Sequence, residues 1–161
     1  MLLQLLTRFL HSSDFAEMKT DGTSPFGQAP MLQVDGAKPA LGQSVAVLRY
    51  VAKLAPASGL YPEDPLLAHA VDALADQEKD FWTGAAVSKY TARFGFGALN
   101  AEENAALLAQ IRTAVHDEVK PRHLANVEAM MKAGGTAWIA GTDKPSFADF
   151  VWVGVVEVRC W

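Results

Sequence analysis

The chain has 161 residues, of which half are apolar and a fifth are charged, and its formal net charge is −4. This balance excludes a disordered chain, and the mild acidity argues against a nucleic-acid or anionic-membrane partner, because either would need a basic face. Cys160 is the only cysteine, which excludes an internal disulfide and fits a reducing compartment such as the cytoplasm.

Two apolar runs near the ends of the chain are predicted to be neither a leader nor a membrane span. The run from Met1 to Leu6 has no basic residue ahead of it, and Arg8 follows it, so a secretory signal peptide is disfavoured. The run from Phe147 to Val158 contains two acidic residues and is shorter than the roughly 20 residues that a membrane span needs. We therefore expect a buried helix there and no membrane partner.

The chain begins with an apolar segment and a polar one. Leu5 to Leu10 fits either a strand or the end of a helix, which periodicity alone cannot separate at this length. Ser12 to Ser24 is polar and contains Gly22, a residue that favours turns. We predict a loop there, with one helical turn around Phe15 to Lys19.

A β-hairpin is predicted after Pro30. Met31 to Val34 forms a short strand, Asp35-Gly36 a two-residue turn in which glycine tolerates a positive φ, and Lys38 to Leu41 the return strand. Pro39 cannot donate to a strand ladder, which indicates an edge position.

From Ser44 onward the chain is predicted to be helical apart from one linker. Ser44 opens an amphipathic helix, and the segment from Ala55 to Pro65, rich in proline, is the linker between two domains. Long helices are expected over Leu66 to Tyr90 and over Ala101 to Lys132, the latter kinked or divided at Pro121. A break is expected at Arg93 to Asn100, and a last helix from Ser146.

Several residues have side chains or positions suited to binding or capping. Pro30 precedes the first hairpin strand and is a candidate for a cis bond, with an ordinary trans proline as the alternative. Ser44 is a good N-cap residue. The start of the helix that it opens is either a binding site for a carboxylate or an ordinary capped end. Ser146 and Asp149 have the spacing of a capping box, which is a folding role. The four histidines and the lone cysteine lack the spacing of metal ligands, so no metal is expected.

The segment from Pro25 to Tyr50, P-F-G-Q-A-P-M-L-Q-V-D-G-A-K-P-A-L-G-Q-S-V-A-V-L-R-Y, resembles the glutathione-binding half of cytosolic glutathione S-transferases of the sigma, alpha, mu and pi classes. The later S-F-A-D box fits the same family. The resemblance implies an α+β fold, with residues 1–54 as a thioredoxin-like domain that lacks its first strand and helix. Residues 55–65 are then a linker and residues 66–161 an all-helical domain. Relative to the family, the chain is interpreted as truncated at both ends.

The resemblance also implies a glutathione site. In the family, the residue after the cis-proline pairs its backbone with the cysteinyl backbone of glutathione, and this place falls on Met31. The Gln-Ser pair, here Gln43 and Ser44, holds the γ-glutamyl end, and Gln28 reaches the peptide backbone. Further implied positions are Lys19 and Phe15 for the glycyl carboxylate (with Phe15 where sigma-like members often carry Trp), Asp80 for the ligand of a partner subunit, and Tyr90 and Phe94 for the second substrate.

The implied function is conjugation of glutathione, as a substrate, to a small hydrophobic electrophile by a cytoplasmic homodimer, or an isomerisation as in sigma-like prostaglandin synthases. No tyrosine precedes Pro25, so no catalytic residue that activates the thiol is identified. This leaves a second hypothesis open, a non-catalytic binding or structural protein of the same family. A third is a helical adaptor with no thiol ligand.

Overall fold

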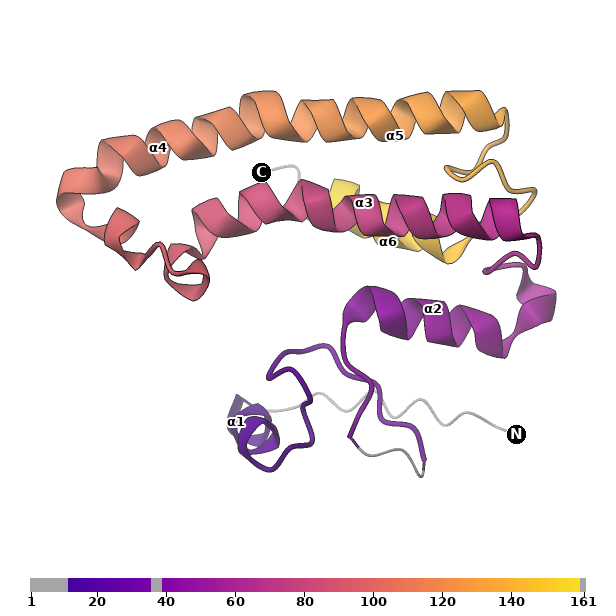
Figure 1. Cartoon of the computed structure of the whole chain (residues 1–161), viewed down its shortest axis with the longest axis horizontal. Helices are drawn as coiled ribbons and strands as arrows, with labels where there is room; N and C mark the ends of the chain where they lie inside the picture. The colour runs from indigo at the N-terminus through magenta and orange to yellow at the C-terminus, as the bar shows by residue number, and fades with distance from the viewer. Residues whose placement is uncertain (1–11, 36–38, 160–161) are drawn as a thin grey trace. The chain divides into compact units, whose positions relative to one another are not determined.

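A computed structural model describes residues 12–35 and 39–159. The chain divides into two compact units, Met1–Leu54 and Ala55–Trp161, and each is described by itself. The strand or helix end expected at Leu5 to Leu10 lies outside the described residues. The helices are α1 (Ser12–Thr20) and α2 (Ser44–Leu54) in the first unit, and α3 (Pro65–Lys89), α4 (Ala105–Ala114), α5 (Lys120–Gly134) and α6 (Phe147–Arg159) in the second (Figure 1).

The hairpin predicted in the first unit is reduced, within the described residues, to one antiparallel bridge. Leu32 and Leu41 each donate a backbone N–H to the other's carbonyl, both at 2.9 Å. A two-residue turn at Asp35-Gly36 would have placed Leu32 opposite Pro39, which has no N–H to donate. The pairing with Leu41 avoids that loss. Since no strand is formed in the described part of residues 1–54, the thioredoxin-like architecture stays a prediction.

The loop predicted over Ser12 to Ser24 is wrong, because most of it is the helix α1. Polar contacts mark the end of that helix: the Thr20 hydroxyl donates to the Glu17 carbonyl at 2.8 Å. Beyond it, the backbone N–H of Ser24 donates to the Met18 carbonyl at 2.8 Å. The segment has no amphipathic periodicity strong enough to predict a nine-residue helix, so the sequence pattern showed only a single turn of it.

The predicted helix over Leu66 to Tyr90 is confirmed within one residue at each end as α3. Its start has two local signals. The Asp64 carboxylate accepts hydrogen bonds from the N–H groups of Leu66 and Leu67 at 3.0 and 2.9 Å, and Pro65 occupies the first turn, where a missing N–H costs nothing.

The helix predicted over Ala101 to Lys132 is divided next to Pro121, as predicted, and Pro121 lies in the first turn of α5. A π-helical segment, Val115–Val119, joins α4 to α5 just ahead of the proline. Val115 and Val119 both pack against Gly84 of α3, since each has a methyl carbon 3.6 Å from where a Cβ on Gly84 would lie. Two branched side chains four residues apart thus pack on the same glycine. The predicted break before it consists of the short 3₁₀ segments Thr91–Phe94, Gly97–Asn100 and Glu102–Asn104.

The core of the second unit is the packing of α6 on α3. The buried Trp152 indole donates from Nε1 to the Leu74 carbonyl at 2.8 Å, and the Trp152 and Phe81 rings meet edge to face with centroids 5.8 Å apart. The indole therefore buries a large apolar surface while its N–H stays bonded. Around it are the buried side chains of Val71, Ala75, Phe147, Ala148, Val151 and Val155.

The capping box ahead of α6 is formed with one change from the predicted pattern. Asp149 reaches back, accepting the Ser146 N–H at 2.8 Å, as predicted. The Ser146 hydroxyl, however, donates to the same carboxylate at 2.8 Å instead of accepting from an amide. The other Asp149 oxygen accepts the Ile139 N–H at 3.0 Å. One carboxylate thus joins the helix start to the loop before it.

Gly134 and Gly141 meet backbone to backbone. A Cβ on Gly134 would lie 2.7 Å from the Gly141 Cα atom, closer than real contacts allow. Gly134→Ala should therefore destabilise the second unit by about 1–3 kcal/mol, because backbone must shift to admit the methyl group. Denaturant unfolding followed by tryptophan fluorescence measures this, since all four tryptophans lie beyond residue 54.

The matched control is Gly154→Ala in α6, where an added Cβ meets nothing within 4 Å. This change should stabilise the helix by about 0.5–1 kcal/mol, because alanine is the better helix former. A Gly134→Ala variant as stable as the Gly154→Ala variant would contradict the packing described for Gly134.

Candidate functional site

The backbone of Met31 faces an edge that is unpaired within the described residues. In an antiparallel pair, neighbouring residues along a strand direct their N–H and C=O groups to opposite edges. Leu32 uses both groups on Leu41, so the groups of Met31 point to the other side. No described residue forms a backbone hydrogen bond with them. A ligand with its own peptide backbone could therefore pair with Met31 as an added strand.

The turn before Met31 is organised by a buried serine. The Ser24 hydroxyl accepts the Gln28 N–H at 3.1 Å and donates to the Gln28 carbonyl at 3.4 Å, while the Gly27 N–H donates to the Ser24 carbonyl at 3.2 Å. The Gln28 side chain remains exposed. The bond between Ala29 and Pro30 is cis. Sequence reasoning missed Ser24, although a serine ahead of a proline and glycine turn is a known turn-forming signal.

The start of α2 lies next in the same register. Because Leu32 pairs with Leu41, Met31 stands opposite Gly42, and Gln43 and Ser44 follow directly. The Gln43 carbonyl accepts the first helical hydrogen bond, from the Val47 N–H at 2.9 Å. Gln43 is therefore the N-cap residue, and the assignment of that position to Ser44 is wrong by one residue. Ser44 is the first helical residue and is exposed.

Gln43 has a φ of +68°, which no other non-glycine residue in the described ranges shares in sign. Left-handed backbone is uncommon for a glutamine and costs free energy that surrounding contacts must supply. The conformation turns the chain out of the Leu41 pairing and into α2. It thus sets the direction of the helix start, and the exposed backbone N–H groups there attract anions.

Contacts between the two motif segments hold these parts together. A Cβ on Gly42 would lie 2.8 Å from the Phe26 ring and 3.3 Å from a Pro25 side-chain carbon. The Pro25-Phe26 segment therefore lies directly on the glycine before Gln43. This contact brings the turn that carries Gln28 close to the start of α2, as the resemblance implies.

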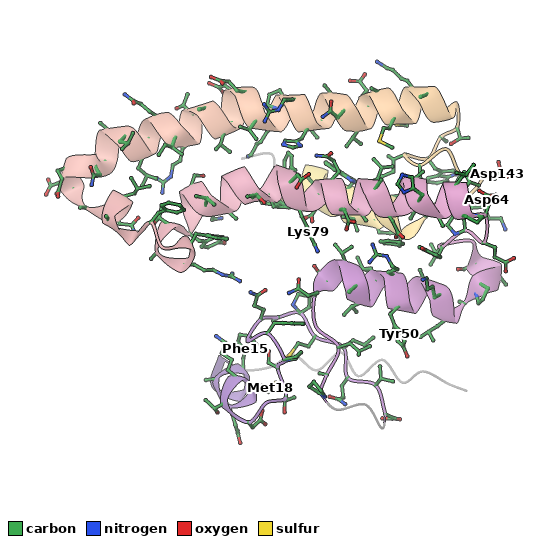
Figure 2. All side chains as sticks on the ribbon, in the orientation of Figure 1. Phe15, Met18, Tyr50, Asp64, Lys79 and Asp143 are labelled. Carbon is green, nitrogen blue, oxygen red and sulfur yellow. The ribbon has the colours of Figure 1, made fainter. Side chains whose placement is uncertain are left out.

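Lys19 and Phe15 both lie on α1, and Figure 2 labels Phe15 there. The Lys19 ammonium stands 4.5 Å from the centroid of the Phe15 ring. A side-chain carbon of Lys19 is 3.9 Å from where a Cβ on Gly27 would lie. These two predicted residues are thus adjacent to each other and to the turn that precedes Gln28.

The other predicted site residues belong to the second unit. Asp80 is exposed on α3, and the Tyr90 and Phe94 side chains are 51% and 43% exposed at the end of that helix and in the 3₁₀ segment after it. The Lys89 ammonium lies 5.6 Å from the centroid of the Tyr90 ring. The three residues thus present one carboxylate and two aromatic rings at the surface.

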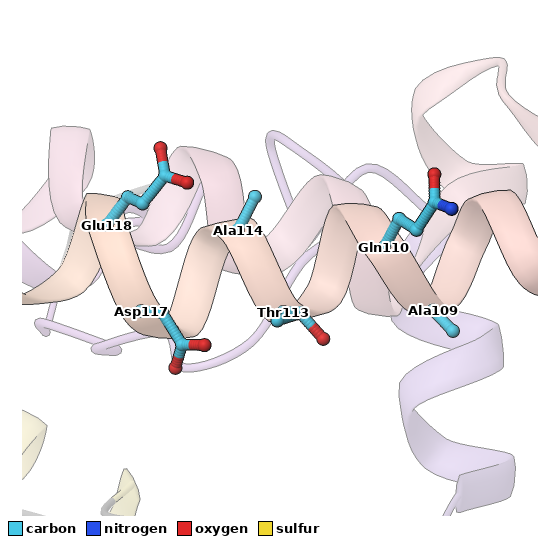
Figure 3. A pocket seen from close by; sticks show the side chains of 6 residues that line it. All are labelled: Ala109, Gln110, Thr113, Ala114, Asp117 and Glu118. Atoms are coloured by element: carbon cyan, nitrogen blue, oxygen red, sulfur yellow. The ribbon is translucent and has the colours of Figure 1, made fainter.

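A shallow pocket lies on a different face of the second unit, along α4 and the π-helical segment (Figure 3). None of the predicted site residues lines it. Its three acidic or amide side chains, Gln110, Asp117 and Glu118, are exposed, and the Asp117 carboxylate is bonded to His116 Nδ1 at 2.7 Å. The lining residues are Ala109, Gln110, Thr113, Ala114, Asp117 and Glu118.

Two further features, a metal centre and a membrane span, depend on residue type and on helix length. Within residues 12–35 and 39–159, no three His, Cys, Asp or Glu side chains gather in a way that could hold a metal ion. In the same ranges, no helix combines the length and apolarity that crossing a bilayer requires.

Comparison with known proteins points to one family. The chain is 29% identical to glutathione S-transferase 4 of Caenorhabditis elegans over 133 residues, and 27% identical to a glutathione S-transferase of Anopheles gambiae over 135 residues. These matches cover 83% and 84% of this chain. A shorter stretch of 58 residues is 50% identical to the probable glutathione S-transferase 6 of C. elegans. No family model matches the chain.

A solved structure, prostaglandin synthase D of Nilaparvata lugens, superposes with a TM-score of 0.70 over 92% of this chain and 65% of that one, at 23% identity. At this identity the match shows the fold. The chain spans 58% of the length of each of the two relatives that it matches over most of its own length. The resemblance predicted from the sequence is confirmed.

The strained Gln43 can be tested without any ligand. Gln43→Gly should leave stability unchanged or raise it by up to about 1 kcal/mol, because glycine adopts positive φ freely. Gln43→Val should lower stability by at least about 1 kcal/mol, because a β-branched residue resists that conformation. Denaturant unfolding followed by circular dichroism measures both variants.

Gln110 within α4 provides the control for these substitutions. At this helical position glycine should be the less favourable residue. Gln110→Gly should lower the free energy of unfolding by about 1 kcal/mol, since glycine is a poor helix former. If Gln43→Gly destabilises the protein as much as Gln110→Gly, the positive φ described for Gln43 is contradicted.

Proposed function

As this chain is a relative of the glutathione S-transferases in sequence and in fold, we propose that it binds glutathione and conjugates it to small hydrophobic electrophiles. One observation carries the proposal. Met31, whose backbone groups no described residue pairs, stands by the Leu32–Leu41 register opposite Gly42, two residues before the start of α2. A site for peptide backbone and a site for a carboxylate thus adjoin, and glutathione is a peptide with a carboxylate at each end.

Each end of glutathione has a candidate partner in the first unit. The cysteinyl backbone would pair with the N–H and C=O of Met31. The γ-glutamyl carboxylate would accept hydrogen bonds from the N–H groups at the start of α2 and from the Ser44 hydroxyl, helped by the positive end of the helix dipole. Gln28 would contact the peptide, and Lys19 would attract the glycyl carboxylate.

The second unit would contribute to substrate binding in a homodimer. Exposed Asp80 would receive the γ-glutamyl ammonium of the ligand in the partner subunit. Tyr90 and Phe94 would offer aromatic surface to the electrophile, since exposed rings bind apolar ligands well. The cytoplasm is the compartment we propose, because glutathione is kept reduced there.

A non-catalytic role in binding glutathione is the second candidate. Conjugation needs a group that favours the thiolate of glutathione, because the thiolate is the nucleophile. The three tyrosines of the chain, Tyr50, Tyr61 and Tyr90, all follow the start of α2. No described side chain is assigned this role, so the chain could hold glutathione without activating it.

Binding and turnover separate these candidates. We expect glutathione to bind, measured by isothermal titration calorimetry and by retention on immobilised glutathione. Ser44→Ala should weaken binding about tenfold or more, because a hydrogen bond to a charged group contributes about 1.5–3 kcal/mol. Since Gln43 and not Ser44 caps α2, this change should leave stability nearly unaltered.

Ser58→Ala in the second unit is the control, as its exposed hydroxyl donates to the Ala55 carbonyl at 2.6 Å and lies outside the proposed site. Equal retention of wild type and Ser44→Ala would contradict the site. An aryl-halide conjugation assay then decides catalysis: retention on glutathione without turnover above background would select the non-catalytic candidate.

A further inference from the structure

Ser24 is hydrogen-bonded through its side chain and through both of its backbone groups. Its hydroxyl accepts the Gln28 N–H at 3.1 Å and donates to the Gln28 carbonyl at 3.4 Å, so one side chain engages both backbone groups of one residue. The Ser24 N–H donates to the Met18 carbonyl at 2.8 Å, and the Ser24 carbonyl accepts the Gly27 N–H at 3.2 Å. Ser24 is only 5% exposed, which shields these bonds from competing water.

A second hydrogen bond ties the same part of the chain to the segment that pairs with Leu32. The Thr23 carbonyl accepts the Ala40 N–H at 3.3 Å. Thr23 directly precedes the serine, and Ala40, which is buried, directly precedes Leu41, the partner of Leu32. Three links, at the serine hydroxyl, at Thr23 and at the Leu32 pairing, therefore close a ring of hydrogen bonds between these segments.

Met31 lies between two of these links. Its segment is held at one end by the bonds to Gln28, three residues before Met31, and at the other by the pairing of Leu32, the next residue. Three residues span at most about 11 Å when fully extended, so two anchors this close leave Met31 little freedom. A segment held in this way presents its backbone to a peptide ligand without a further ordering step.

We propose that Ser24 is a positioning residue, whose buried hydroxyl holds the backbone of Gln28 and thereby fixes the edge of Met31 before glutathione binds. The inference rests on the proposed function and deepens it, because it assigns part of the affinity to a residue that does not touch the ligand. The hydroxyl is used within the chain, so its contribution passes through the segment that carries Met31. Removing it returns the cost of ordering that segment to the binding step.

Two substitutions separate the hydroxyl from the rest of the Ser24 side chain. Ser24→Ala should raise the glutathione Kd about three- to tenfold, measured by calorimetry on the whole chain, the range for a hydrogen bond between uncharged groups. Ser24→Thr keeps the hydroxyl and should bind glutathione much as wild type does. The matched control is Thr20→Ala, which removes a hydroxyl that donates to the Glu17 carbonyl at 2.8 Å in the same unit and belongs to none of the three links. It should leave the Kd unaltered.

Amide hydrogen exchange, followed residue by residue by NMR, tests whether the effect is local. In wild type the Gln28 N–H should be protected, and glutathione should protect the Met31 N–H. In Ser24→Ala, at the same glutathione concentration, both amides should exchange faster. The Val47 amide, which donates to the Gln43 carbonyl at the start of α2, should keep its wild-type rate. A general loss of stability would instead accelerate exchange at all three amides and would overturn the positioning role.

Across wild type, Ser24→Thr and Ser24→Ala, affinity for glutathione should follow the protection of the Gln28 N–H. A Ser24→Ala chain that loses this protection and still binds as wild type does overturns the inference, and so does an equal loss of affinity in Thr20→Ala. If Ser24→Ala does not fold, wild type and Ser24→Thr still decide, because an unprotected Gln28 amide with binding intact excludes the role. A wild type that protects Gln28 but binds no glutathione overturns the proposed function, and the inference with it.

Discussion

Two backbone hydrogen bonds between Leu32 and Leu41 set the geometry on which the candidate site depends. They turn the polar groups of Met31 away from the Leu41 segment, to an edge that no described residue pairs, and they place the start of α2 three residues after Leu41. A slip of one residue would turn those groups toward the partner segment and close the edge to a ligand. The binding of a peptide ligand at Met31 and of a carboxylate at α2 therefore follows from one register.

The two units are stabilised by different interactions. The second has an apolar core between α3 and α6, in which even the polar indole N–H of Trp152 is bonded to a carbonyl. In the described part of the first, polar contacts around Ser24 and the ring contact of Phe26 with Gly42 organise the turns. Segments held this way present backbone groups and side chains at the surface, which suits recognition more than stability.

Prediction from sequence succeeded where the signal is local. Asp64 and Pro65 mark the start of α3 by capping and by a fixed φ, and Asp149 reaches back to Ser146 across one turn. It failed for α1, whose end is marked by hydrogen bonds that no apolar pattern reveals. It placed the division of the long helix correctly at Pro121, which lies in the first turn of α5, but did not show that a π-helical segment precedes it.

By itself, the sequence indicated the resemblance to glutathione S-transferases through the motif from Pro25 to Tyr50, and it predicted α3 to within one residue at each end. The tertiary structure alone decided the pairing of Leu32 with Leu41, the left-handed backbone of Gln43 and the closeness of Lys19 to the turn that carries Gln28. Each of these depends on groups from segments separated along the chain. Their positions follow from hydrogen bonds and contacts between those segments, which local propensity and periodicity do not encode.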